Sequence, residues 1–95
     1  MSLKQAYEQK LRAQLDAWKT DIDQLKAKAD KAEADVQLEY YKKIEELRMK
    51  QESAREKLQE LENAGEDAWE DLKAGIESAW DDLRDSIKSA TSRFK

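Results

Sequence analysis

Three pairs of adjacent acidic residues are the side chains in this sequence best suited to chemistry: Glu66-Asp67, Glu70-Asp71 and Asp81-Asp82. Carboxylate oxygens are the ligands that Ca²⁺ and Mg²⁺ prefer. Adjacent residues of a helix point in different directions, however, so one pair cannot close on an ion without loop geometry. Histidine and cysteine are absent, which removes the commonest general base and the thiolate nucleophile. We therefore expect a solvated acidic face and no enzyme activity, metal or cofactor; a metal-dependent enzyme is the weaker alternative.

The composition favours one small helical domain over residues 1–95. The chain has no proline and only two glycines, and 42% of its residues are charged. Its net charge of −4 argues against nucleic-acid binding, which needs Lys and Arg gathered on one face. The N-terminal sequence has no apolar run typical of a signal peptide, and no stretch reaches the roughly 18–20 apolar residues of a membrane span. These features predict a cytoplasmic protein.

The last third of the chain contains an 11-residue repeat. Residues 68–78 are followed by a second copy at 79–89 and a truncated third copy at 90–95. Eleven residues correspond to about 3.67 residues per turn over three turns, which keeps one apolar stripe on a nearly straight helix. The repeat therefore predicts an amphipathic helix that lies along another surface.

The same helical spacing continues upstream, from Leu3 to Leu61. Sixteen steps between apolar or small residues cover 58 residues, or 3.6 per step. Gln51 interrupts this stripe, either as a residue that fixes helix register or as a wet rim position. Asn63 and Gly65 tolerate the left-handed conformation found after many helices, and they indicate a turn. We predict an all-α, unequal helical hairpin or coiled coil, with a long helix over about 3–62, a turn over 63–66 and a second helix over 67–93. A continuous rod is the alternative.

An unequal hairpin would leave the apolar stripe on residues 3–35 uncovered. Exposed apolar surface of that extent marks an interaction site, and a second antiparallel copy is the simplest cover. We therefore expect a homodimer or a larger homo-oligomeric bundle, with an unknown protein client as a further partner. The predicted interface residues are Leu11, Leu15, Trp18, Ile22, Leu25, Val36, Ile44, Leu47, Leu58, Leu61, Trp69, Leu72, Ile76, Trp80, Leu83 and Ile87.

The tryptophans of the repeat allow a second interpretation. Trp69 and Trp80 lie on the aliphatic stripe, and a helix of this kind can enter a lipid interface. Residues 66–85 carry eight acids against two bases, however, and anionic lipid would repel them. We prefer a bundle core for these side chains and keep a membrane-peripheral amphipathic helix as the alternative function.

The repeat also resembles a group of small bacterial coiled-coil proteins. The matching sequence is Ala68-Trp-Glu-Asp-Leu-Lys-Ala-Gly75 and Ala79-Trp-Asp-Asp-Leu83, preceded by Gly65-Glu66-Asp67 and followed by Ala90-Thr-Ser-Arg-Phe94. The group occurs in proteobacteria and cyanobacteria, and some members are described as stress-response proteins. The resemblance implies a non-enzymatic, cytoplasmic helical protein associated with environmental stress, acting in a structural or protective role.

Overall fold

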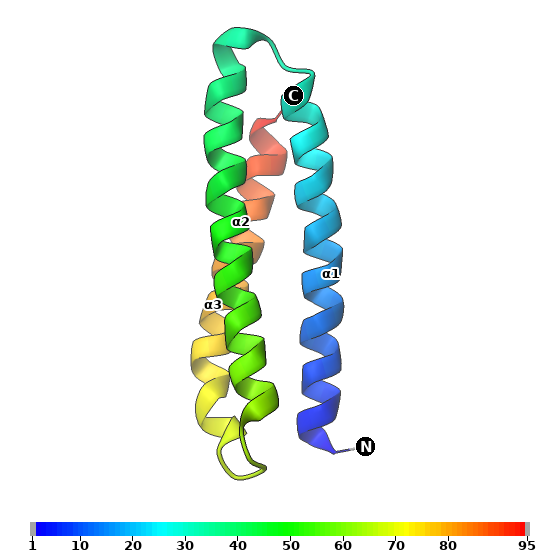
Figure 1. Ribbon diagram of the computed structural model, residues 1–95, viewed down its shortest axis with the longest axis vertical. Coiled ribbons are helices and arrows are strands. Elements are labelled where there is room, and N and C mark those ends of the chain that lie inside the picture. The colour runs from blue at the N-terminus through cyan, green and yellow to red at the C-terminus, as the bar shows by residue number, and fades with distance from the viewer. Residues whose placement is uncertain (1, 95) are drawn as a thin grey trace.

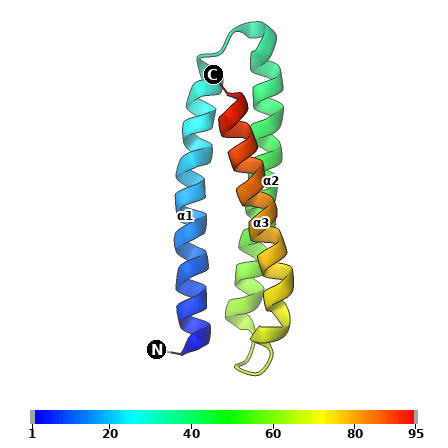
Figure 2. The ribbon, with the colours of Figure 1, turned by 180° about the vertical axis from the view of Figure 1, so that it is seen from behind.

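Residues 2–94, which the computed structural model describes, form three α-helices joined by two short turns (Figure 1). The helices are α1 (Leu3–Asp30), α2 (Ala34–Asn63) and α3 (Trp69–Arg93). The predicted all-α class is confirmed. Helix α2 is antiparallel to its two neighbours, so α1 and α3 run in the same direction (Figure 2). The bundle measures 51 × 20 × 18 Å. Met1 and Lys95, the two ends of the predicted domain, lie outside the described residues.

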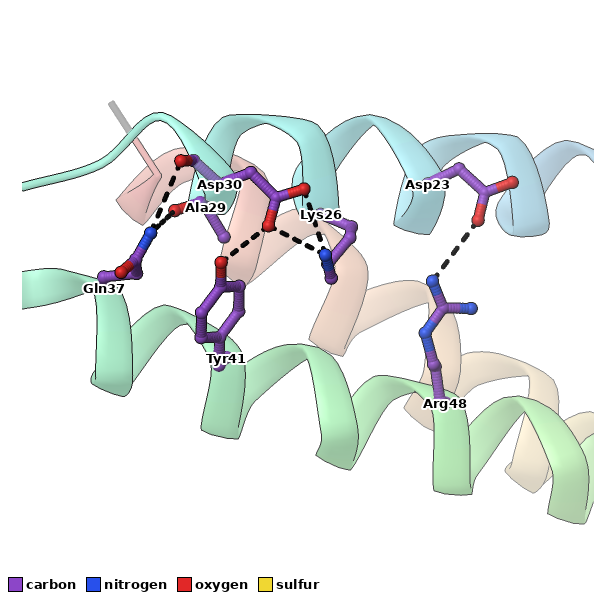
Figure 3. Close-up of polar contacts among 7 residues, drawn as sticks. All are labelled: Asp23, Lys26, Ala29, Asp30, Gln37, Tyr41 and Arg48. Atoms are coloured by element: carbon purple, nitrogen blue, oxygen red, sulfur yellow. Dashed lines mark hydrogen bonds and ion pairs between the residues drawn. The ribbon is translucent and has the colours of Figure 1, made fainter.

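The predicted long helix over residues 3–62 is wrong, because the chain turns between Asp30 and Ala34. No glycine or proline marks this turn. Its stabilising contact comes from the next helix, where the side-chain amide of Gln37 donates to the carbonyl oxygens of Ala29 (3.1 Å) and Asp30 (3.4 Å), as Figure 3 shows. Free carbonyls at a helix end need such partners. Glu33 then adopts an extended conformation and starts α2.

Polar contacts continue along the α1–α2 interface (Figure 3). The Lys26 ammonium lies 2.7 Å from the Asp30 carboxylate, and the Tyr41 hydroxyl donates to that carboxylate at 2.6 Å. The hydrogen bond from Lys26, followed by that from Tyr41, lowers the pKa of Asp30. The hydrogen bond between Tyr41 and Asp30 is also the main cause that raises the pKa of Tyr41. Further along the two helices, Arg48 lies 3.4 Å from Asp23. Two of these contacts, Tyr41–Asp30 and Arg48–Asp23, therefore join α1 to α2.

The second turn was predicted at the right place for a partly wrong reason. Helix α2 ends at Asn63 and α3 begins at Trp69, so the α2–α3 hairpin is confirmed. Neither Asn63 nor Gly65 has a positive φ, and a Cβ added to Gly65 would meet no atom within 4 Å. The Gly65 carbonyl instead accepts hydrogen bonds from the backbone N–H groups of Ala68 (3.1 Å) and Trp69 (3.3 Å). The turn therefore depends on these bonds and not on a left-handed glycine.

One apolar core runs along the axis between the three helices. Its fully buried large side chains are Ile22, Leu47, Leu61, Ile76 and Leu83. Burial of each such side chain stabilises the fold by about 1.5–3 kcal/mol. Because α1 folds back beside the other helices, the stripe expected to be exposed on residues 3–35 is largely covered within one chain. The continuous rod is excluded for the same reason.

The C-terminal end of the apolar stripe also packs against the same chain. Phe94, from the truncated third repeat, stacks on Tyr40 with ring centroids 4.1 Å apart and an interplanar angle of 14°. The Tyr40 hydroxyl donates to the carbonyl oxygen of Arg93 at 3.3 Å. Gln51 is half-buried and lines a groove with α1 residues, which matches the rim position and not a hydrogen-bonded register device.

Candidate interaction surface

Most of the predicted interface residues are core residues of a single chain. The buried ones are Leu11, Leu15, Ile22, Leu25, Ile44, Leu47, Leu58, Leu61, Trp69, Ile76, Trp80, Leu83 and Ile87. The half-buried ones are Trp18, Val36 and Leu72. The buried set cannot form an intermolecular contact while the bundle is closed. The stripe therefore no longer requires a second copy, and self-association stays a prediction that needs another surface.

Such a surface lies along α1 and α3, which run side by side in the bundle (Figure 2). Two grooves lie end to end along this pair of helices, with volumes of about 250 Å³ and about 560 Å³, and both are lined by Trp18 and Arg84. We call this region the seam surface. Its exposed and half-buried residues on α1 are Tyr7, Lys10, Gln14, Trp18, Asp21, Gln24 and Lys28, and its exposed residues on α3 are Glu77, Asp81, Arg84, Lys88, Thr91 and Ser92.

Aromatic contacts hold α1 and α3 together at the seam. The rings of Trp18 and Trp80 are 6.4 Å apart, and those of Tyr7 and Trp69 are 5.8 Å apart. The Lys73 ammonium lies over the Tyr7 ring, 5.4 Å from its centroid. Tilted aromatic pairs of this kind contribute about 0.5–1.5 kcal/mol beyond their burial. These contacts stabilise the packing of α1 on α3 but do not fill the two grooves beside them.

Two buried polar atoms at the seam lack hydrogen-bond partners among residues 2–94. They are the indole Nε1 of Trp80, a residue only 5% exposed, and the hydroxyl of Tyr7. Burial, followed by the nearby carboxylate of Glu77, raises the pKa of Tyr7. Glu77 acts on this hydroxyl through its charge, because the two groups do not meet the geometry of a hydrogen bond. An unpaired buried donor costs about 1–3 kcal/mol, so the seam pairs its polar groups incompletely within one chain.

A stripe of four exposed charges runs along the α3 side of the seam. Glu77, Asp81, Arg84 and Lys88 are spaced four, three and four residues apart, which places them on one helix face. Two acids therefore precede two bases. Arg84 forms a salt bridge of 3.3 Å with Asp81, whereas Glu77 and Lys88 form none within the described part of the chain.

The change from acidic to basic residues along the repeat is visible in the sequence and could have indicated this stripe. The position of the stripe beside a second helix could not be predicted, because it depends on which helix packs against α3. The predicted acidic pairs are all exposed. Within residues 2–94, no three Asp or Glu side chains gather closely enough to hold a metal ion.

A second apolar area lies on the outer face of α2. Met49 is 69% exposed, and it lines a shallow hollow together with Tyr41 and Ile44. Leu38 is 64% exposed and lies 11 residues earlier, near the same helix face. Scattered exposed apolar side chains are normal on helical proteins. Unlike the seam, this area has no unpartnered polar atom and no ordered charge pattern among the described residues.

None of the helices formed by residues 2–94 combines the length and apolar character needed to span a membrane. Comparison of the chain with protein-family models, with curated proteins and with solved structures finds no match.

Proposed function

We propose that this protein is a non-enzymatic helical-bundle protein that binds other protein surfaces through its seam surface, in a structural or protective role. The observation that carries the proposal is the seam itself. Two adjoining grooves there combine the half-buried ring of Trp18 with exposed charges of both signs. Protein interfaces favour this combination of aromatic side chains and a polar rim.

The resemblance of the repeat to stress-associated bacterial coiled-coil proteins supports the wider setting of this proposal. We place the protein in the bacterial cytoplasm, where it would act under environmental stress by covering surfaces of other proteins. Self-association belongs to the same proposal, because a surface that binds other helices also suits a second copy.

The membrane-peripheral alternative has less support than protein binding. The tryptophans that suggested it, Trp69 and Trp80, are only 7% and 5% exposed. Their entry into a lipid interface would require α3 to leave the bundle and expose the apolar core to water. No comparable opening is needed for protein binding at the seam.

Protection of a heat-labile enzyme from aggregation tests the proposed function. Light scattering of the heated enzyme is measured with the wild-type protein and with two matched variants, Trp18→Ser at the seam and Leu38→Ser on the outer face of α2. We expect the wild type and Leu38→Ser to suppress scattering and Trp18→Ser to lose most of this effect. Circular dichroism confirms that each variant is folded. Equal protection by both variants, or none by the wild type, would overturn the proposal.

A further inference from the structure

We infer that the seam surface binds a second copy of this chain in antiparallel orientation, seam against seam. This inference rests on the proposed function, because it names one occupant for the same binding surface. It differs from the dimer expected from the sequence, since the contact is made by exposed and half-buried residues of a closed bundle. The apolar core stays intact in both copies.

Charge complementarity on α3 is the first argument for a second copy. The order along the stripe is acid, acid, base, base, with Asp81 and Arg84 on either side of its midpoint. When two such stripes face each other in opposite directions, Glu77 of each copy meets Lys88 of the other, and Asp81 meets Arg84. The charges then pair four times by symmetry. In parallel alignment of the two stripes, like charges would meet, which disfavours that arrangement.

The α1 side of the seam has a matching symmetry. Its midpoint lies between Ala17 and Trp18, so antiparallel docking places Gln14 opposite Asp21 and Tyr7 opposite Lys28. The first pair can form a hydrogen bond, and the second can form a cation–π contact.

The two midpoints lie within one helical turn of each other along the bundle. Trp18 contacts Trp80, about three residues before the α3 midpoint, and it lines both grooves together with Arg84. A single twofold axis between the two copies can therefore pass close to both midpoints, as a closed dimer of identical chains requires. A partner unrelated to this chain would have no reason to match that symmetry.

The long face of the bundle sets an upper limit on the contact area. It measures 51 × 20 Å, or about 1,000 Å². A standard protein interface buries about 800 Å² on each partner, so the dimer would use most of this face.

Two complementary charge variants test this inference by sedimentation equilibrium. Arg84→Glu/Lys88→Glu makes the α3 stripe entirely acidic, and Glu77→Lys/Asp81→Lys makes it entirely basic. All four positions are exposed, so the bundle should fold in each variant. We expect the wild type to sediment with twice the 11.1 kDa mass of the chain. Each variant alone should raise the dimer Kd at least about tenfold, because like charges then face each other. An equimolar mixture should restore a dimer at least as tight as that of the wild type.

A matched control changes the same number of charges away from the seam. Lys42→Glu/Arg55→Glu on α2 alters the net charge as the acidic seam variant does, and it should leave the wild-type Kd unchanged. A monomeric wild type, or a dimer that the mixture does not restore, would overturn the inference. The inference and the proposed function can fail separately. If the wild type is monomeric but Trp18→Ser still abolishes protection of the heated enzyme, the dimer is wrong and the seam binds other proteins.

Discussion

The two interfaces that α1 makes are built from different interactions. Against α2, polar side chains meet in defined pairs, including Tyr41 with Asp30 at 2.6 Å and Gln37 with the carbonyl of Ala29 at 3.1 Å. Against α3, aromatic rings meet at 5.8 and 6.4 Å, and among residues 2–94 no side-chain hydrogen bond or salt bridge joins these two helices.

Under the proposed function, this difference separates the interface that holds the fold together from the surface that binds a partner. Directional polar pairs favour one alignment of α1 on α2, and the apolar core beneath them supplies most of the stability. The α1–α3 interface leaves grooves and an ordered stripe of exposed charges, which we propose that another surface contacts. Changes at the first interface should therefore act mainly on stability, and changes at the second mainly on binding.

The largest effect should come from the core that both interfaces share. Ile22 is 0% exposed, and its replacement in Ile22→Ala should lower the free energy of unfolding by about 2–4 kcal/mol through lost burial and a cavity. Leu38→Ala, at a position 64% exposed, should change it by less than about 0.5 kcal/mol. Urea denaturation followed by circular dichroism measures both. Similar losses in the two variants would contradict the assigned burial.

The same substitution at two tyrosines should change the stability differently at the two interfaces. Tyr41→Phe removes the hydrogen bond to Asp30 and should lower the thermal midpoint by a few degrees. Tyr7→Phe removes a buried hydroxyl that has no partner among residues 2–94, and it should be neutral or stabilise the fold by up to about 1 kcal/mol. Thermal denaturation of both variants beside the wild type provides the comparison. A greater loss from Tyr7→Phe than from Tyr41→Phe would reverse our assignment of the two interfaces.

The smallest effect should be a pH dependence at the α1–α2 interface. The pKa of Asp30 is lowered in the folded state, so its contribution is present above the unfolded value of 3.8 and is lost as the pH falls through the folded value. The pKa of Tyr41 is raised, so its contribution is present below 10.0 and is lost as the pH rises further. Asp30→Asn should therefore flatten the dependence of the thermal midpoint on pH at both ends.

The control for this pH effect is Asp16→Asn, an exposed acid on the same helix that forms no salt bridge within the described residues. It should retain the acid and alkaline loss of the wild type. An unchanged pH profile in Asp30→Asn would show that the Lys26–Asp30–Tyr41 contacts do not contribute to stability in solution.

The sequence predicted the helical character of the chain and its apolar stripe, but not how often the chain turns. A helical stripe keeps its phase whether the helix continues or folds back, so periodicity alone could not distinguish one long helix from two. The turn after Asp30 lacks glycine and proline, and Gln37, which caps the end of α1, belongs to the next helix. Its role appears only when α1 and α2 lie side by side.

The seam surface could not be predicted from the sequence for a related reason. The stripe from Glu77 to Lys88 begins about 60 residues after Trp18 in the sequence, and only the three-helix arrangement brings them together. The predicted interface residues had the correct apolar character, yet most of them are buried inside one chain. Which faces remain uncovered depends on the topology and not on the pattern of any single helix.

Oxidative crosslinking of a single introduced cysteine tests the antiparallel seam dimer most directly, because the chain has no cysteine of its own. Ala17 is exposed and lies between Gln14 and Asp21, next to the proposed twofold axis. Disulfide formation needs Cα atoms within about 7 Å. We predict that Ala17→Cys forms a covalent dimer rapidly under mild oxidation, whereas Ser53→Cys, exposed on α2, remains a monomer. Equally slow crosslinking of the two variants would contradict the seam-to-seam arrangement.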